Sequence, residues 1–375
     1  MTDARPGRGP VGGGPGGEDV PGAGGVRATG GAPGGGGVPA AIALSPIVWS
    51  RYGPEDLDRI RAVAPGARLV TVAPDGAADG SLDDVEVLLR GSGLSGEMLE
   101  RVLARAPRVR WIHSASVGVE QVLIPATLER GIVVTNGRGV FSRPIAEYVL
   151  MMMLATARRL PALLDLQRER TWQPLQGQEL RDLTVGIVGL GSIGRAVASY
   201  AGAVGARVVA VRRHPERGVA SEPAIDEDPL PLPPRADLVL PPSGLHELLG
   251  QSDFVVLAVP LTGGTEALID EAALAATRPG AWLINVARGR LVDEPALLRA
   301  LRQGSLGGAV LDTFRDEPLP RTSPFYGLPN VIVTPHTSWA SDRVRQRSIE
   351  VFLANLGRFV QGLPLHNVVD LGAGY

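Results

Sequence analysis

The glycine-rich segment Gly189-Leu-Gly-Ser-Ile-Gly194 constrains the fold of this chain more than any other feature. It follows a short apolar run and precedes apolar residues at helical spacing, so it reads as a turn between a strand and a helix. In that setting Gly189 permits the tight turn, Gly191 lets the backbone approach a pyrophosphate, and Gly194 allows close packing of helix on strand. The helix that opens at Ser192 and Ile193 directs its first amides at negative charge. The segment predicts a doubly wound α/β domain that binds a dinucleotide.

Composition limits the remaining chemistry. A chain of 375 residues with 44% hydrophobic content can form two compact domains, and a formal charge of -2 gives no global attraction to nucleic acid. There is no cysteine, which excludes disulfides, thiolate nucleophiles and cysteine metal sites, and we expect no metal site. There is also no lysine, so all 37 basic residues are arginine, and Schiff-base catalysis and a Walker-type phosphate loop are excluded.

The ends of the chain and its apolar runs predict where the protein resides. Residues 1–39 are dominated by glycine and proline with few large apolar side chains, so we expect a disordered tail that is neither a secretory signal nor a transit peptide. The longest apolar run, 148–157, is too short to span a bilayer. We therefore expect no membrane contact and a cytoplasmic location.

Strand and helix patterns alternate from residue 40 onward, which predicts parallel sheets. In the first series we expect strands at 40–49, 68–72, 85–89, 109–113 and 132–135, and helices at 54–63, 96–104 (capped by Ser95) and 119–129. A long helix at 144–160 leads to strands at 184–189, 207–211, 238–240, 254–259, 281–285, 308–311 and 331–333, with a surface insertion at 218–234. A single oversized sheet is the alternative, but the long helix separates two complete series.

The end of the second strand of the later series indicates which dinucleotide binds. An acidic residue about 20 positions after the glycines normally accepts from the ribose 2′-hydroxyl of NAD. Here that place holds Arg212-Arg213-His214, and an arginine pair suits a 2′-phosphate instead. We therefore favour NADP over NAD. The alternative is that the arginines are ordinary solvated residues of an exposed loop.

Three polar residues follow three later strands, at the sheet edge where ligands bind in open α/β folds. They are Arg288, Glu317 and His336. Each has a plain structural reading, because a histidine before a helix can be a cap, Glu-Pro can be a turn, and an arginine can be solvated. Their joint arrangement with the glycine segment is what predicts an active site.

That joint arrangement resembles the D-isomer-specific 2-hydroxyacid dehydrogenases over nearly all of residues 40–370. Besides the glycine segment, the matching stretches are Val259-Pro-Leu-Thr262, Pro279-Gly-Ala-Trp-Leu-Ile-Asn-Val-Ala-Arg-Gly289, Val292-Asp293, Asp312-Thr-Phe with Glu317-Pro318, and Thr334-Pro-His336. Ser114-Ala-Ser-Val-Gly-Val119 is similar to the family's substrate-carboxylate loop, and Val133-Val-Thr-Asn136 with Ala146-Glu147 is similar to the segment that enters its hinge helix.

The resemblance implies a role for each matching residue. Arg288 would hold the substrate carboxylate and polarise the carbonyl oxygen, rather than its neighbour Arg290. His336 would supply the proton, and Glu317 would favour its imidazolium form. Backbone amides of Ser116, Val117 and Gly118 would support the substrate carboxylate, and Val259, Pro260, Thr265 and Asp312 would join the glycine segment and the arginine pair at the cofactor.

The family also implies a domain arrangement and an assembly. A Rossmann NAD(P)-binding domain at 149–337 would be inserted into a flavodoxin-like substrate-binding domain made of 40–148 and 338–375. We expect a homodimer through the cofactor domain, and closure of the cleft between the domains would exclude water from the site.

Departures from the family pattern bear on the substrate. Glu317 in place of glutamine argues against the formate dehydrogenase branch, Tyr148 replaces a frequent histidine, and Trp339 stands at the expected helix start after His336, as a pocket residue or as a core aromatic. We expect no regulatory domain after the second hinge, which argues against a serine-controlled phosphoglycerate dehydrogenase. Reduction of glyoxylate or hydroxypyruvate is therefore the favoured activity, and a phosphoglycerate or D-lactate dehydrogenase is the enzymatic alternative.

Two further readings concern other activities. The chain could also be an NAD(H)-sensing, corepressor-like interaction protein, which is a function of another class. The presence of Arg288, Glu317 and His336 does not distinguish this function from a dehydrogenase, because corepressors of the family retain them. A hydrolase of the adenosylhomocysteine type is disfavoured by the missing lysine and cysteine.

Overall fold

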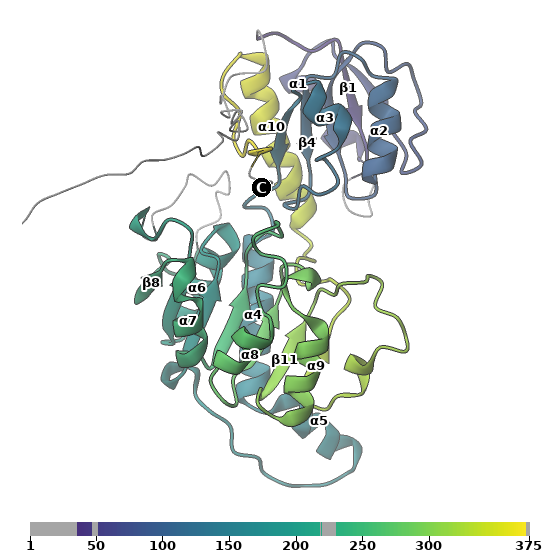
Figure 1. Ribbon diagram of the computed structural model, residues 1–375. Helices are drawn as coiled ribbons and strands as arrows, with labels where there is room; N and C mark the ends of the chain where they lie inside the picture. The colour runs from purple at the N-terminus through teal and green to yellow at the C-terminus, as the bar shows by residue number, and fades with distance from the viewer. Residues whose placement is uncertain (1–35, 47–51, 218, 220–229, 373–375) are drawn as a thin grey trace, which may run out of the picture.

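The computed structural model describes residues 36–46, 52–217, 219 and 230–372, and it contains two parallel β-sheets, each covered by helices on both faces (Figure 1). The predicted fold class is confirmed. The expected disordered tail, except its last few residues, and most of the expected insertion at 218–234 lie outside the described residues. In the described part of the chain, no helix combines the length and the apolar character that a bilayer span requires.

The smaller sheet has five strands in the order β2-β1-β3-β4-β5, which is the flavodoxin-like order. Its strands are β1 (Ala41–Leu44), β2 (Arg68–Thr71), β3 (Val85–Arg90), β4 (Trp111–Ser114) and β5 (Val133–Asn136). Because alternate strand residues point to opposite faces, two separate cores form. One face packs on α2 (Gly96–Ala104) and α3 (Pro125–Glu129), and the other on α1 (Pro54–Val63) and α10 (Val344–Val360). Helix α10, from the end of the chain, therefore lies against the earliest elements (Figure 1).

The larger sheet has seven strands in the order β12-β11-β10-β9-β6-β7-β8. They are β6 (Thr184–Val188), β7 (Arg207–Val211), β8 (Leu238–Leu240), β9 (Phe254–Leu257), β10 (Trp282–Asn285), β11 (Gly308–Leu311) and β12 (Val331–Val333). Helices α4 (Ser142–Ala157) and α6 (Ser192–Ala203) cover one face, and α7 (Leu245–Gln251), α8 (Glu271–Ala276) and α9 (Glu294–Gln303) the other. Strand order reverses between β6 and β9, so a ligand crevice is expected outside their carboxyl ends.

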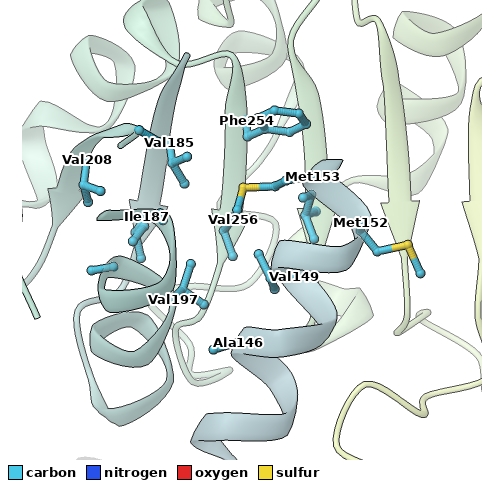
Figure 2. Packing of buried hydrophobic residues seen from close by; sticks show 14 of the residues in the cluster. Ala146, Val149, Met152, Met153, Val185, Ile187, Val197, Val208, Phe254 and Val256 are labelled. Atoms are coloured by element: carbon cyan, nitrogen blue, oxygen red, sulfur yellow. The ribbon is translucent and has the colours of Figure 1, made fainter. Parts of the chain in front are cut away.

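Helix α4 follows the last strand of the smaller sheet and buries its apolar side against the larger one. Figure 2 shows this packing, with Ala146, Val149, Met152 and Met153 of the helix facing side chains of the sheet. Full burial of a side chain the size of valine or methionine stabilises a fold by about 1.5–3 kcal/mol. The helix is therefore anchored to the larger sheet although the chain enters it from the smaller one.

Three expected helices have different bounds. The helix expected at 119–129 is wrong in its first half: 119–124 form turns and α3 begins at Pro125, because an interior proline lacks an N–H and clashes with the preceding turn. The helix expected at 144–160 ends at Ala157, and after Arg159, at φ 55°, a further helix, α5 (Leu160–Arg168), continues the chain.

The helix expected directly after His336 begins only at Val344, so Trp339 does not stand at a helix start. The physical reason lies in Asp312. Its carboxylate accepts hydrogen bonds from the amides of Thr337 and Ser338, at 2.8 and 2.9 Å, and holds this segment in an irregular turn.

Candidate active site

A cleft of about 1510 Å³ opens along the carboxyl ends of strands from both sheets. Most of its lining comes from the loops after β4 and β5 of the smaller sheet and after β6, β7, β9, β10, β11 and β12 of the larger one. Of the residues that the sequence assigned to the substrate, the cofactor and catalysis, all but Gly194 line this cleft, and Gly194 instead packs against Gly189. Arg290, the rejected competitor of Arg288, does not line it. Among the described residues there is no group of three or more His, Asp or Glu side chains suited to a metal ion.

The glycine segment forms a tight cradle between β6 and α6. Gly189 has a φ of 101°, in the region that favours glycine, and a Cβ on Gly194 would lie 1.9 Å from the Gly189 carbonyl oxygen. A Cβ on Gly191 would meet nothing within 4 Å, so its backbone is open to a ligand. Helix α6 begins at Ser192, with Gly191 as its N-cap, and turns its first amides toward the cleft. These features fit a bound pyrophosphate.

The loop after β9 packs against this cradle. A Cβ on Gly189 would lie 2.6 Å from Val259 Cγ1, which shows how closely the two loops approach. Thr265 ties the loop together, since its hydroxyl donates to the Pro260 carbonyl at 2.7 Å and accepts from the Thr262 amide at 2.8 Å. These residues therefore form a second wall of the dinucleotide part of the cleft.

The arginine pair lies where the cofactor prediction needs it, directly after β7. Arg212 and Arg213 both line the cleft, and the Arg212 amide donates to the Leu240 carbonyl at 3.0 Å. His214, which also lines the cleft, pairs with Glu216 at 3.2 Å. An NAD-binding site usually has a carboxylate at the end of this strand, which accepts a hydrogen bond from the ribose 2′-hydroxyl. At the end of β7 the chain instead reads Val211-Arg212-Arg213, without a carboxylate.

An imidazole–carboxylate pair, His336 and Glu317, lines the cleft. His336 Nδ1 lies 2.7 Å from Glu317 Oε2, and Glu317 Oε1 accepts from the Phe314 amide at 2.9 Å. Burial raises the pKa of Glu317, but the hydrogen bonds from His336 and the Phe314 amide outweigh it and hold that pKa below its usual value. With a carboxylate on Nδ1, the other ring nitrogen is the one available for proton exchange with a ligand.

Asp312 braces the segment that carries His336. The buried carboxylate accepts from the Thr334 hydroxyl at 2.6 Å as well as from the Thr337 and Ser338 amides, and the Asp312 carbonyl accepts from the His336 amide at 2.8 Å. Asp312 was assigned to the cofactor, and it does line the cleft. Its hydrogen bonds show in addition that it positions His336.

Arg288 lines the same cleft, in the loop after β10. Its backbone is fixed by Asn285, whose side chain donates to the Arg288 carbonyl at 2.9 Å and accepts from the Ala287 amide at 3.1 Å. The guanidinium lies so close to Gly118 that a Cβ there would be 1.8 Å from Nη2. Arg290, two residues on, pairs instead with Glu266 at 2.7 Å and is absent from the cleft lining.

The loop 116–118 reaches Arg288 from the smaller sheet. Asn136, at the end of β5, donates to the Val117 carbonyl at 3.0 Å, and the Gly137 amide donates to the Ser116 carbonyl at 3.0 Å. A Cβ at Gly137 would lie 2.9 Å from the Ala115 carbonyl oxygen, so only glycine fits beside this loop. Asn136 was noted only as part of the segment entering the hinge helix, and the structure shows that it shapes the substrate loop.

Sequence reasoning missed Glu120, a charged residue of the cleft lining. It belongs to the same loop, and its carboxylate accepts from Arg288 Nε at 2.9 Å. An acidic residue two positions after Gly118 was visible in the sequence, but nothing in its spacing indicated that it would pair with an arginine 168 residues later. Trp339 also lines the cleft, with its indole N–H donating to the His336 carbonyl at 2.7 Å and its ring against Phe141.

Comparison with known families and proteins agrees with this geometry. The family model described as "D-isomer specific 2-hydroxyacid dehydrogenase, NAD binding domain" matches residues 150–338. A glyoxylate reductase of Thermococcus gammatolerans is 35% identical over 288 residues, which are 74% of this chain and 80% of the relative. A D-3-phosphoglycerate dehydrogenase of Mycobacterium tuberculosis is 38% identical over 281 residues, 73% of this chain, and the chain spans about half (49%) of the length of that relative.

Solved structures match over nearly the whole chain. A D-isomer specific 2-hydroxyacid dehydrogenase from Xanthobacter autotrophicus, in complex with NADPH and MES, superposes with a TM-score of 0.74 at 28% identity, covering 90% of this chain and 99% of that one. An NADPH-dependent glyoxylate/hydroxypyruvate reductase from Sinorhizobium meliloti, in complex with NADP and sulfate, gives 0.72 at 27% identity, covering 90% and 100%.

Proposed function

Because the chain belongs to the D-isomer-specific 2-hydroxyacid dehydrogenases, we propose that it transfers a hydride between NADP(H) and a small 2-oxo or D-2-hydroxy acid. The observation that carries this proposal is that one cleft brings together the glycine cradle, Arg288 and the His336–Glu317 pair at 2.7 Å. A dinucleotide site, a cation for a carboxylate and a carboxylate-oriented imidazole are what reduction of a 2-oxo acid requires.

In this function Arg288 binds the substrate carboxylate and polarises the carbonyl oxygen, and the backbone amides of the loop 116–118 support the carboxylate. The nicotinamide, when bound, supplies the hydride to the carbonyl carbon. His336 donates a proton to the carbonyl oxygen, so the oxo group becomes a hydroxyl. Glu317 stabilises the imidazolium from which that proton leaves and holds the ring in place.

The residues at the cofactor part of the cleft fit a dinucleotide, and they favour NADP over NAD in this proposal. A cradle in which a side chain at Gly189 or Gly194 would clash leaves room only for backbone beside the pyrophosphate. Arg212 and Arg213 line the cleft directly after β7, where a 2′-phosphate would lie. Two structural relatives carry NADPH or NADP in the same fold.

Glyoxylate or hydroxypyruvate is the proposed substrate. The support is the NADP assignment together with relatives named glyoxylate reductase, which match most of their own length. The alternative is a phosphoglycerate or D-lactate type of oxidation, the first supported by the 38% identity to phosphoglycerate dehydrogenases.

We propose that the protein is a homodimer formed through the cofactor domain. Helices α4 and α5 and the segment after them carry large apolar side chains that are exposed in the single chain: Met151, Leu154, Leu160, Leu163, Leu164 and Trp172. Trp172 is fully exposed, at 102% of its reference surface. A cluster of exposed large apolar side chains on neighbouring elements is typical of a protein–protein contact.

The test is the initial rate of NADPH oxidation, with NADH in parallel, against glyoxylate, hydroxypyruvate, pyruvate, phenylpyruvate and 3-phosphohydroxypyruvate. We expect turnover, faster with NADPH, with glyoxylate or hydroxypyruvate as the best substrate. Tight cofactor binding without turnover of any oxo acid would instead favour a cofactor-sensing interaction protein.

The double variant Arg212→Gln/Arg213→Gln tests the cofactor assignment. It should raise KM for NADPH about ten- to a hundredfold, which corresponds to losing a charged hydrogen bond of ~1.5–3 kcal/mol, and leave KM for NADH within about twofold. Arg235→Gln, which removes an exposed arginine paired with Asp237, is the matched control. Equal losses for both cofactors would contradict the assignment.

A further inference from the structure

The guanidinium to which the substrate carboxylate is assigned already holds a carboxylate of the protein. Glu120 Oε1 accepts from Arg288 Nε at 2.9 Å, and Glu120 Oε2 lies 3.5 Å from Nη2. The remaining nitrogen, Nη1, donates to the Ala287 carbonyl at 2.8 Å. The Nε–Nη2 edge is one of the two edges on which a guanidinium binds a carboxylate with two parallel hydrogen bonds. A substrate carboxylate that uses this edge has to displace Glu120.

Glu120 is an anion at neutral pH. Burial raises its pKa, but the charge and hydrogen bonds of Arg288, its own backbone and the charge of Arg90 outweigh burial and hold that pKa below the usual value. The carboxylate is therefore a charged competitor for Arg288 and not a neutral neighbour.

Arg90 is a second, buried cation whose charge acts on Glu120. It stands at the end of β3, 2% exposed, with Nη2 donating to the Leu94 carbonyl at 2.5 Å and Nη1 3.5 Å from the Ser114 hydroxyl. Within the described residues its Nε has no hydrogen-bond partner. Burial lowers the pKa of Arg90 to about 10, and the charge of Glu120 opposes that shift, so the two groups already interact.

We propose that Glu120 is an internal competitor of the substrate: it occupies Arg288 in the empty site, and an incoming 2-oxo acid exchanges its own carboxylate for that of Glu120. The inference rests on the proposed function, since it takes Arg288 as the substrate anchor. The exchange keeps Arg288 paired at every stage, so no isolated guanidinium faces the cleft before the substrate arrives. Glu120 thereby sets the affinity for the acid and does not take part in the transfer itself.

The test is the dissociation constant of oxamate, an unreactive analogue with a carboxylate beside a carbonyl, for the full chain with NADPH bound. Glu120→Gln keeps the size of the side chain and removes its charge. A partly exposed pair of this kind is worth up to about 1 kcal/mol, so the variant should bind oxamate about three- to fivefold more tightly. KM for the best oxo acid should fall by a similar factor while kcat stays within about twofold.

Glu266→Gln is the matched control, because it breaks the neighbouring Arg290–Glu266 pair outside the cleft, where the glutamate is similarly exposed. It should leave oxamate binding unchanged. If Glu120 instead holds Arg288 in position, Glu120→Gln will bind oxamate more weakly and lower kcat/KM, and that result overturns the proposal, as does unchanged binding.

A second variant and the wild-type turnover separate the possible failures. Should Glu120→Gln fold poorly, Glu120→Asp, which withdraws the carboxylate by one methylene, should still bind oxamate more tightly than the wild type. Failure of the proposed function appears separately, as a wild type that turns over none of the oxo acids. Wild-type turnover with no gain in oxamate affinity in either variant overturns this inference alone.

Discussion

His336 holds a backbone φ of 49°, a region in which few residues other than glycine are found but in which histidine is enriched. Two hydrogen bonds from its amide, to the carbonyls of Asp312 at 2.8 Å and Thr334 at 3.1 Å, hold it there. The conformation is therefore imposed by Asp312 and its neighbours. It directs the ring toward Glu317. Within the described residues, the Glu317 carboxylate is the only side chain to which the His336 ring is hydrogen-bonded.

At this scale we predict that His336→Gln lowers kcat for reduction by about 10²–10⁴, the usual contribution of a positioned general acid. NADPH binding, measured by the change in cofactor fluorescence, should stay within about twofold, because the glycine cradle is untouched. His246→Gln, which removes an exposed histidine of α7, is the control and should keep both. Loss of reduction together with NADPH binding would show that His336 is a structural residue.

The connection between β6 and α6 is the element on which the cofactor assignment depends. Gly194 faces the Gly189 carbonyl at a distance that excludes even one methyl group, so helix and strand lie closer than any other residue would allow. Gly202 lies on the same helix, and a Cβ there would meet nothing within 4 Å. Substitution of Gly194 therefore tests the close packing of helix on strand, and substitution of Gly202 tests helix propensity alone.

We predict that Gly194→Ala lowers the free energy of unfolding by about 1–3 kcal/mol through overpacking and weakens NADPH binding at least about tenfold, since α6 has to move away from the pyrophosphate. Gly202→Ala should instead stabilise the protein by about 0.5–1 kcal/mol and leave NADPH binding unchanged. Urea denaturation and cofactor titration measure both effects. Wild-type affinity in Gly194→Ala would remove the cradle from the cofactor site.

On α4 and α5, both in the domain of the larger sheet, the large apolar side chains of Met151, Leu154, Leu160, Leu163 and Leu164 are exposed. Helix α5 stands at the end of that domain away from the smaller sheet (Figure 1). We predict that light scattering at micromolar concentration finds a dimer of the 39.2 kDa chain, and that Met151→Asp with Leu154→Asp shifts it to monomer, because two buried charges without partners are costly at an interface. Leu128→Asp places the same charge on an exposed leucine of α3 and should leave the dimer intact. A wild type that is only monomeric would contradict this assembly.

Local pattern was sufficient for most of the fold. The strand-to-helix turn at Gly189, the short apolar strands and the Ser95 cap, which accepts from the Met98 amide at 3.3 Å, are set by residues within a few positions of one another. Local pattern misplaced the helix expected at 119–129 and missed α5, because apolar spacing does not show where Pro125 or the left-handed Arg159 interrupts a helix.

The sequence by itself determined the two parallel sheets, the glycine turn and the residue types of the candidate site, because apolar strand runs, turn chemistry and the loops after strands are local properties. Only the tertiary structure decided which of these residues meet. Glu317 and His336 are 19 positions apart and join through two neighbouring strands, and Glu120 reaches Arg288 across 168 positions, between the two sheets. Such pairs depend on how the sheets pack in space, which no spacing along the chain records.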